Sequence, residues 1–218
     1  YPQGVDGPTM MNELKEQAER FGTKVEIDFI SKVDFSKDKG GIHKLYTQNG
    51  DEIKSKTVII STGASAKYLG LESEQRLIGG GVSACAVCDG FFYKNQDVAI
   101  VGGGDTAIEE ATYLAKICTN VTMLVRKDYF RASKAMQNRL SNFDNIKVLF
   151  NHEVEEVIGE NVVDGLKIKN NLTNDVSELK ITGLFIAIGH SPNTDIFKGL
   201  VDMDDSGYIL TDKTSTKT

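Results

Sequence analysis

The spacing of apolar and polar residues predicts a helix followed by short strands in the first part of the chain. In residues 7–21 apolar side chains recur every three or four positions and Gly22 follows, which is typical of an amphipathic helix. The segments after it alternate like half-buried strands of a small meander, with Asn49-Gly50 as a tight turn before Ile53. We expect strands at residues 24–29, 31–35 and 42–46, and a fully apolar strand at residues 57–60.

Beyond residue 97 the pattern changes to apolar strands that alternate with amphipathic helices. Strands are expected at residues 97–101, 121–125 and 146–150, and helices at residues 105–118 and 131–140, the second with Ser133 as its N-cap. A second meander then follows. We expect its strands at residues 153–158, 162–169 and 176–181, and a last buried strand at residues 184–188.

This order of elements predicts an α/β fold with two related nucleotide-binding domains. The order β-α-β-α-β, then meander, then β is complete from about residue 97 to residue 189, which is typical of a Rossmann-like NAD(P)-binding domain with a β-meander. The N-terminal part has only the later half of a similar order. Gly79-Gly80-Gly81 would give a flexible approach to the second domain, so a boundary or hinge is expected between Ser65 and Gly81.

Composition narrows the class of protein. The chain has 218 residues, 40% of them hydrophobic, which suffices for one large domain or two small ones. A net charge of −6 without a lysine- or arginine-rich tract argues against nucleic acid or an anionic membrane as the main partner, and no apolar run approaches the roughly 18 residues of a membrane span. Three cysteines are too few for a secreted disulfide framework, so a reducing, cytoplasmic setting is expected.

A glycine-rich loop between the strand at residues 97–101 and the next helix matches the dinucleotide fingerprint. Gly102 would permit the tight turn, Gly104 would let a pyrophosphate meet the backbone, and Ala107 would allow close helix packing. The helix start supplies free N–H groups for phosphate. The alternative is an ordinary turn, but the strand before and the helix after favour a cofactor site. Its expected residues are Gly102, Gly103, Gly104, Asp105, Thr106 and Ala107.

Cations follow the next strand, at the position that selects between NAD and NADP. An NAD site would place an acidic residue about 20 residues past the glycines, where it binds the ribose hydroxyls. This chain has Arg126 and Lys127 there, with Arg131 close behind. Guanidinium groups form charge-assisted bonds to a 2′-phosphate, so NADP is favoured. A solvated basic turn is the alternative.

The Cys-x-x-Cys pair of Cys85 and Cys88 precedes the glycine loop. Structural zinc would need a second ligand pair, and the sequence has no other Cys-x-x-Cys and only scattered histidines, so no metal site is expected. Two inert buried thiols are a second alternative, and a reversible disulfide is favoured. Thiol-disulfide exchange needs a proton for the leaving thiol, which Asp89 could supply, unless Asp89 only caps a short turn. Cys118 is expected in the core.

With these motifs the chain resembles the low-molecular-weight, bacterial-type thioredoxin reductases over essentially its whole length. Residues 84–90, ACAVCDG, match the redox motif of that family and stand just before the NADPH fingerprint, whereas other pyridine nucleotide-disulfide reductases carry the pair in the FAD domain. Residues 61–64 and 188–194 are similar to the junctions between the two domains. In the phosphate motif, Val125 and Lys127 stand where the family has histidine and arginine.

The resemblance implies NADPH and FAD as cofactors, and an NADPH-binding domain inserted in an FAD-binding domain of related three-layer fold that is incomplete here. It implies a partial FAD-binding domain at residues 1–65, the NADPH-binding domain with the cysteine pair at 66–192, and the start of the returning FAD-binding segment at 193–218. The N-terminal FAD glycine motif and the C-terminal Gly-Asp motif are absent, and no methionine begins the chain, so a fragment of a longer enzyme is expected. Further cofactor contacts are implied at Thr62, Gly63, Ile188 and Gly189.

The activity implied by the resemblance is electron transfer from NADPH to FAD, to the Cys85–Cys88 disulfide and then to the disulfide of thioredoxin, in a homodimer. The cysteines share a domain with NADPH, so the resemblance also implies a rigid rotation of that domain about linkers near residues 62–65 and 191–194. Which cysteine attacks thioredoxin stays open. Two alternatives remain, a related flavoprotein that reduces another dithiol partner and an inactive NADP-binding fragment.

Overall fold

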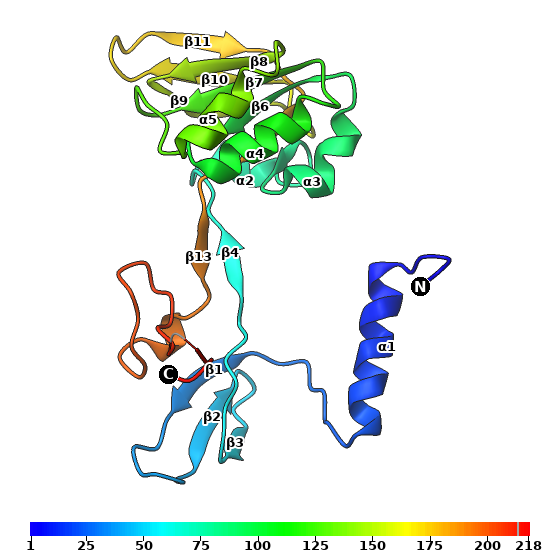
Figure 1. Cartoon of the computed structure of the whole chain (residues 1–218), viewed down its shortest axis with the longest axis vertical. Helices are drawn as coiled ribbons and strands as arrows, with labels where there is room; N and C mark the ends of the chain where they lie inside the picture. Colours follow the sequence, from blue (N-terminus) through cyan, green and yellow to red (C-terminus); the bar gives the residue numbers. More distant parts are fainter. Residues whose placement is uncertain (213) are drawn as a thin grey trace. The chain divides into compact units, whose positions relative to one another are not determined.

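A computed structural model describes residues 1–212 and 214–218 (Figure 1). The chain divides into two compact units. The discontinuous unit consists of Tyr1–Thr62 with Thr194–Thr218, and the continuous unit is Gly63–Asn193. No helix among the described residues is long and apolar enough to cross a bilayer.

A five-stranded, all-parallel sheet forms the centre of the continuous unit, in the order β5-β12-β6-β7-β8. Strand β6 occupies the residues predicted for it, and the ends of the others differ from prediction by a few residues at most, except β5, which was not predicted. The bounds are β5 Val82–Ser83, β6 Asp97–Val101, β7 Asn120–Val125, β8 Ile146–Phe150 and β12 Gly183–Ile186.

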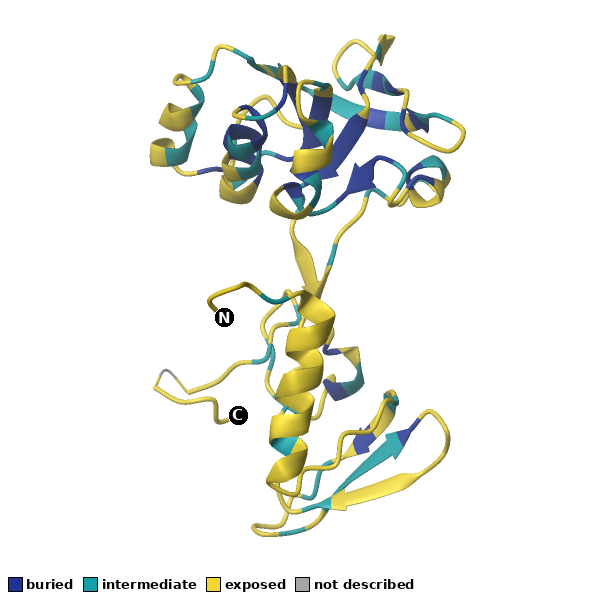
Figure 2. Ribbon diagram, turned by 90° about the vertical axis from the view of Figure 1, so that its right-hand side faces the viewer, coloured by how far each residue is buried: buried dark blue, intermediate teal, exposed yellow. Residues whose placement is uncertain are grey.

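The central strands are buried on both faces, which explains their largely apolar sequences, with Thr122 as a buried polar residue in β7 (Figure 2). Successive side chains of a strand point to opposite faces. In β6, Val98 and Ile100 therefore pack into one apolar cluster, whereas Ala99 and Val101 pack into a second. The first cluster includes side chains of two helices, and the second includes side chains of the meander. The unit is thus a three-layer helix-sheet-meander structure.

Two helices cover the first face of the sheet: α4 (Asp105–Leu114) and α5 (Lys134–Leu140). Ser133 caps α5 as predicted, accepting the Met136 N–H at 3.4 Å. Helix α4 ends before the predicted residue 118, because the next amides bond three residues back in tighter turns, Ile117 to Leu114 among them.

The second face is covered by the antiparallel meander that the sequence predicts, in the order β11-β10-β9. Leu166 and Ile168 of its middle strand belong to the core cluster on that face. The alternation of apolar and polar residues therefore selects the buried side of the meander. Its strands are β9 His152–Ile158, β10 Gly165–Asn170 and β11 Val176–Leu179.

Short elements lead into and out of the sheet, and the sequence pattern did not predict them. Helix α2 (Glu72–Arg76) holds Glu74, which is fully buried. Its carboxyl group accepts the N–H groups of Leu69 and Gly70, both at 2.9 Å, and so closes the preceding loop. The others are α3 (Ala86–Asp89), the 3-10 helix η1 (Gly90–Tyr93), and the antiparallel pair β4 (Ala64–Ala66) and β13 (His190–Pro192).

In the discontinuous unit, α1 (Gly7–Arg20) begins at the N-cap Asp6, whose carboxylate accepts the Thr9 N–H at 3.0 Å. The predicted meander forms a three-stranded antiparallel sheet. Phe35, which follows its first strand, stacks on Phe197 of the 3-10 helix η2 (Asp195–Phe197) with 6.2 Å between ring centroids. The strands are β1 Ile30–Asp34, β2 His43–Thr47 and β3 Glu52–Ser55.

The predictions of strands at residues 24–29 and 57–60 are wrong. Neither segment pairs with a strand among the described residues, and Ile27 and Ile59 are 99% and 90% exposed. Alternating or apolar residues favour an extended chain, but a strand also needs a neighbour to bond its N–H and C=O groups. The predicted α/β class, with a Rossmann-like domain that carries a β-meander, is confirmed.

Glu74→Ala should lower the free energy of unfolding of the continuous unit by about 2 kcal/mol, because it removes two hydrogen bonds to a buried carboxyl group. Urea unfolding followed by circular dichroism measures the change. Glu72→Ala, on the exposed side of the same helix, is the matched control and should shift stability by less than about 0.5 kcal/mol. Equal effects of the two variants would contradict the assigned role of Glu74.

Candidate redox and nucleotide-binding site

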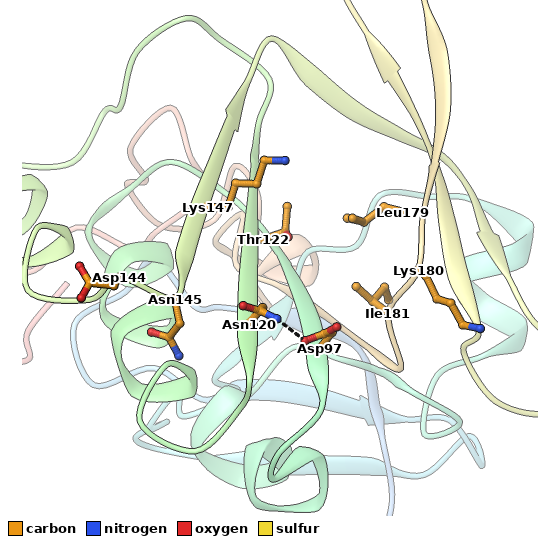
Figure 3. A pocket seen from close by; sticks show the side chains of 9 residues that line it. All are labelled: Asp97, Asn120, Thr122, Asp144, Asn145, Lys147, Leu179, Lys180 and Ile181. Carbon is orange, nitrogen blue, oxygen red and sulfur yellow. Dashed lines mark hydrogen bonds between the residues drawn. The ribbon is translucent and has the colours of Figure 1, made fainter.

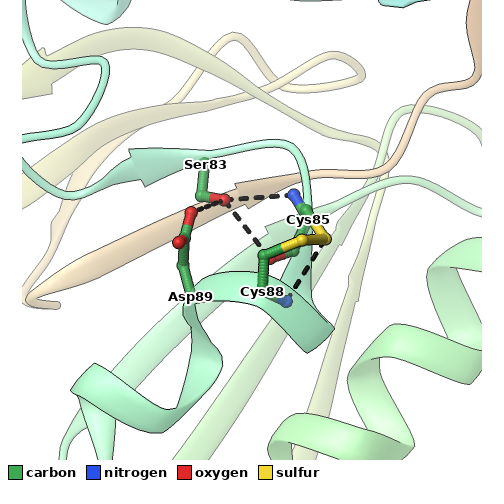
Figure 4. Close-up of a disulfide and its surroundings, with 4 residues drawn as sticks. All are labelled: Ser83, Cys85, Cys88 and Asp89. Atoms are coloured by element: carbon green, nitrogen blue, oxygen red, sulfur yellow. Dashed lines mark hydrogen bonds between the residues drawn. A yellow bond between two sulfur atoms is a disulfide. The ribbon is translucent and has the colours of Figure 1, made fainter. Parts of the chain in front are cut away.

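Cys85 and Cys88 form a disulfide at the start of α3, with their Cα atoms 5.3 Å apart (Figure 4). Cys85 is the N-cap of this short helix, and its Sγ accepts the Cys88 N–H at 3.2 Å. Cys88 is exposed and Cys85 is half-buried. The bond between the sulfurs is therefore open to attack by a thiolate from outside.

Cys118, the remaining cysteine, lies in the core as predicted. Burial, and to a lesser degree the negative charge of Asp97, raises the pKa of its thiol to about 11. The thiol stays protonated at neutral pH and is a poor nucleophile. The redox chemistry of the chain is thus confined to the exposed pair.

Asp89 is the last residue of α3, and its Oδ2 accepts a hydrogen bond from the Ser83 hydroxyl at 2.6 Å. The same hydroxyl oxygen accepts the Cys85 N–H at 3.0 Å. The alternative that Asp89 only caps the following turn is wrong, because η1 begins without a capping hydrogen bond from this side chain. Its carboxylate instead faces back toward the strand before the cysteines.

The glycine loop between β6 and α4 combines tight packing with one open position. A Cβ on Gly102, which has φ +150°, would lie 2.3 Å from the Ala187 carbonyl oxygen, so only glycine fits there. A Cβ on Gly104 would meet nothing within 4 Å. The backbone beside Gly104, at the N-terminus of α4, is therefore free to approach a diphosphate, and the loop fits a dinucleotide.

Hydrogen bonds join the basic segment after β7 to this loop. The Gly103 carbonyl accepts the N–H groups of Arg131 and Ala132 at 2.8 and 3.1 Å, and Asp105 Oδ1 accepts the Ser133 N–H at 2.7 Å. Asp105 and the neighbouring Thr106 are both exposed at the start of α4. The tertiary structure thus places the predicted phosphate-binding cations beside the predicted diphosphate loop.

The side chains of this basic segment point into solvent. Arg126, Lys127 and Arg131 are exposed, and none forms a salt bridge within the described residues. Lys127 Nζ donates to the Tyr129 hydroxyl at 2.9 Å. The Arg126 carbonyl accepts from the Asn171 side chain at 3.2 Å, which anchors the segment to the end of β10. These cations are available for an anionic ligand.

The remaining predicted cofactor contacts lie at the two ends of the β4–β13 pair. Gly63 has φ +66° and its carbonyl accepts the Asn193 N–H at 3.0 Å, whereas Gly189 has φ +100° and its carbonyl accepts the Lys67 N–H at 2.9 Å. Ile188 packs against the core of the continuous unit. Thr62 is the last residue of the first stretch of the discontinuous unit.

Helix α4 also carries Glu110, which the sequence analysis did not single out. Oε2 of its carboxyl group is buried without a hydrogen-bond partner among the described residues. Burial raises the pKa of Glu110 to about 7, the backbone N–H of Ala86 opposes this, and the charge of Glu109 adds to it. The sequence feature that could have indicated its position is the spacing: Glu110 follows the buried Ala107 by three residues and so lies on the same side of the helix.

A cavity of about 260 Å³ lies at the amino ends of β6 and β7, where the Asn120 side chain donates to Asp97 Oδ1 at 2.7 Å (Figure 3). Ligands of open parallel sheets bind at the carboxyl ends of the strands, so this cavity is on the wrong edge for a cofactor. Among residues 1–212 and 214–218, no group of three or more His, Cys, Asp or Glu side chains could hold a metal ion.

Comparison with known proteins agrees with these features. Residues 5–218 match the family described as pyridine nucleotide-disulphide oxidoreductase. The chain is 46% identical to a thioredoxin reductase of Rickettsia conorii, over all of this chain and 70% of that protein. It is also 46% identical to a thioredoxin reductase of Streptomyces coelicolor, over all of this chain and 67% of that protein.

Solved structures give the same result. The thioredoxin reductase of Giardia duodenalis has a TM-score of 0.77 and 34% identity, over all of this chain and 71% of that one. The thioredoxin reductase of Lactococcus lactis has a TM-score of 0.75 and 32% identity, over 98% of this chain and 70% of that one. The resemblance inferred from the redox motif and the glycine loop is confirmed.

Glu110→Gln should flatten the dependence of stability on pH. Because the pKa is raised from 4.5 to about 7, the folded state holds a proton at pH values where the unfolded state has already released it. The stabilisation of the folded state by protonated Glu110 is therefore complete below about pH 4.5, and it is lost as the pH rises to about 7. The amide cannot ionise, so the variant should be more stable than the wild type at pH 8. Urea unfolding at pH 5 and pH 8 measures both effects.

Glu109→Gln, at the exposed neighbouring position on α4, is the control. It should leave most of the pH dependence in place, because the carboxyl group buried beside Ala86 is retained. A Glu110→Gln variant with the same pH dependence as the wild type would contradict the buried, proton-binding carboxyl group.

Proposed function

Because the chain belongs to the pyridine nucleotide-disulphide oxidoreductase family, whose members use flavin and nicotinamide cofactors, we propose that it serves as an NADPH-dependent thioredoxin reductase. The observation that carries the proposal is the Cys85–Cys88 disulfide on α3, which packs against α4, the helix that begins at the glycine loop. A redox-active disulfide and a dinucleotide site thus share one core. The relatives named thioredoxin reductase support the same activity.

The nicotinamide cofactor binds with its diphosphate against Gly102, Gly103 and Gly104 and the first turn of α4, where Asp105 and Thr106 are exposed. Ala107 takes no part in contacts to the ligand, because it is fully buried and keeps the helix close to Gly102. The 2′-phosphate of NADPH is held by the exposed cations of the basic segment, which suit a dianion through charge-assisted hydrogen bonds. These cations are Arg126, Lys127 and Arg131.

We assign residues 66–192 to the NADPH-binding domain, and residues 1–65 and 193–218 to the FAD-binding domain. The flavin contacts within this chain are at Thr62, Gly63, Ile188 and Gly189, near the positions where the chain passes between the two units. The positive φ of Gly63 and Gly189 supports this, since a chain without side chains at these points lets a ligand approach the backbone. When bound, the two cofactors supply the electron pair that reduces the Cys85–Cys88 disulfide.

The cysteines then carry the electrons to thioredoxin. One cysteine, as a thiolate, attacks the thioredoxin disulfide, and a thioredoxin thiolate leaves and takes a proton. The second cysteine loses its proton and attacks the sulfur of the first cysteine in the mixed disulfide. The Cys85–Cys88 bond forms again, and the second thioredoxin sulfur leaves as a thiolate and takes a proton, so that thioredoxin has gained two electrons and two protons. Asp89 gives and receives these protons beside the pair. The active enzyme is a homodimer in the cytoplasm.

Replacing either cysteine by serine should abolish NADPH-dependent reduction of thioredoxin in the flavin-loaded full-length enzyme, because a single thiol cannot form the intramolecular disulfide. The assay follows NADPH absorbance. Cys118→Ala, at the buried free thiol, is the control and should keep most of the activity. Retained turnover in Cys85→Ser or Cys88→Ser would refute the assignment. Turnover with another disulfide but none with thioredoxin would instead show a different dithiol partner.

Arg126→Ala should weaken NADP⁺ binding about 10- to 100-fold, as expected for loss of hydrogen bonds to a charged group, and leave NAD⁺ binding unchanged. Titration calorimetry on the chain measures both and requires no turnover. Lys147→Ala removes an exposed cation at the opposite edge of the sheet and should change neither. Equal loss for both nucleotides would contradict a 2′-phosphate site at Arg126.

A further inference from the structure

Ser83 joins the two ends of the redox helix. It is a buried residue on the edge strand β5, 7% exposed, and its hydroxyl has a contact at each end of the helix that carries the disulfide (Figure 4). The oxygen accepts the Cys85 N–H at the N-cap, and the hydrogen is donated to Asp89 Oδ2 at the last residue. One side chain therefore sets the position of Asp89 relative to Cys85.

The geometry decides where the hydroxyl proton points. Two acceptors lie within reach of the Ser83 hydroxyl: Asp89 Oδ2 at 2.6 Å and the Cys85 carbonyl at 3.4 Å. A hydroxyl has one proton, and the shorter bond to a carboxylate is the stronger of the two. Parallel pairing of Ser83 with Phe185 in the central sheet fixes the backbone from which the hydroxyl extends. Asp89 is thus held by a rigid support.

Ser83 and Asp89 both line a cavity of about 240 Å³. Since a water molecule occupies about 30 Å³ in the liquid, the cavity has room for several, in contact with the carboxyl group. Tyr93 also lines it, and the pKa of its phenol is raised by burial and by the charge of Asp89, so the phenol stays a proton donor. The lining residues are Gly79, Gly81, Val82, Ser83, Asp89, Phe92 and Tyr93.

We propose that Ser83 is a positioning residue for proton transfer at the redox centre, holding the Asp89 carboxyl group against the start of the redox helix and at the wall of the cavity. In this position Asp89 gives a proton to the sulfur that leaves when the Cys85–Cys88 bond is broken, and recovers one from water in the cavity. The proposal deepens the proposed function and rests on it for the biological partner, but the exchange step itself can be measured without that partner.

The step balances with dithiothreitol as the reductant. Its thiolate attacks one sulfur of the pair, the Cys85–Cys88 bond breaks, and the sulfur that leaves takes a proton from Asp89. The second thiol of dithiothreitol loses its proton and closes the oxidised ring, which releases the other cysteine as a thiolate. Two electrons pass from dithiothreitol to the pair. The titratable groups around Asp89 are Tyr93, Cys85 and Cys88 once reduced, and Glu109, Glu110 and Tyr113 on the adjoining helix.

The test compares Ser83→Ala with the wild type in the complete chain, as the rate constant for reduction of the disulfide by dithiothreitol from pH 5 to pH 9. Without the hydroxyl, Asp89 should adopt other rotamers, and the rate should fall about tenfold where proton donation assists the reaction. This loss is smaller than the roughly 10²- to 10⁴-fold that a general acid contributes, because the Asp89 carboxyl group itself is retained. The pH profile should change shape. Ser83→Thr keeps a hydroxyl and should restore both the rate and the profile.

Ser73→Ala is the matched control, because Ser73 is a half-buried serine of the same unit whose hydroxyl also accepts one backbone N–H, from Val157, at 3.0 Å. It should lower stability without changing the pH profile. The double variant Ser83→Ala with Asp89→Asn should be no slower than Asp89→Asn alone, since Ser83 acts through Asp89. An unchanged profile in Ser83→Ala, or losses that multiply in the double variant, would overturn the proposal.

The two proposals can fail separately. A flavin-loaded wild-type enzyme that does not reduce thioredoxin would refute the proposed function, and the dithiothreitol rates would still support or overturn the role of Ser83. A thioredoxin-reducing enzyme in which Ser83→Ala has the same dithiothreitol rates and pH profile as the wild type would overturn the role of Ser83 alone.

Discussion

Burial of both faces of the parallel sheet is the constraint on which the continuous unit depends. Helices cover one face and the meander covers the other, so the residues inside β6, β7 and β12 are apolar except for the buried Thr122. Charged side chains are consequently excluded from the middle of these strands. Binding and redox chemistry is confined to the strand ends, to the loops that follow them and to the outer edge of the sheet. The glycine loop, the basic segment and the redox helix occupy just these places.

The redox pair and the nucleotide loop are linked through a common support, helix α4. Its first turn opens the diphosphate site, and its buried face packs against Ala86 of the redox helix. Ser83 ties the same redox helix to the edge of the sheet. The redox helix is therefore held from two elements, the helix that starts the nucleotide site and the edge strand of the sheet.

The burial of acidic side chains is a feature of this fold that the sequence pattern does not predict. Glu74 and Glu110 both occur in stretches that look like ordinary surface helix, in which acidic residues are common. Glu74 is fully buried and accepts two backbone amides of the preceding loop, and Oε2 of Glu110 is buried. Both carboxyl groups are covered by residues outside their own helices. The apolar-polar pattern within a single helix therefore does not predict which of its acidic residues are buried.

The sequence by itself determined the features that depend on short runs of residues. The glycine loop, the cysteine pair, the strand and helix order around them and the family resemblance are all contained in short runs of residues, because tight turns and buried strands restrict the residue types they accept. Tertiary structure alone decided which of these segments become strands, since residues 24–29 and 57–60 have the pattern but pair with no strand in the described part of the chain. It also decided that Ser83 meets Asp89 across the redox helix, because the fold of that helix brings the two side chains together.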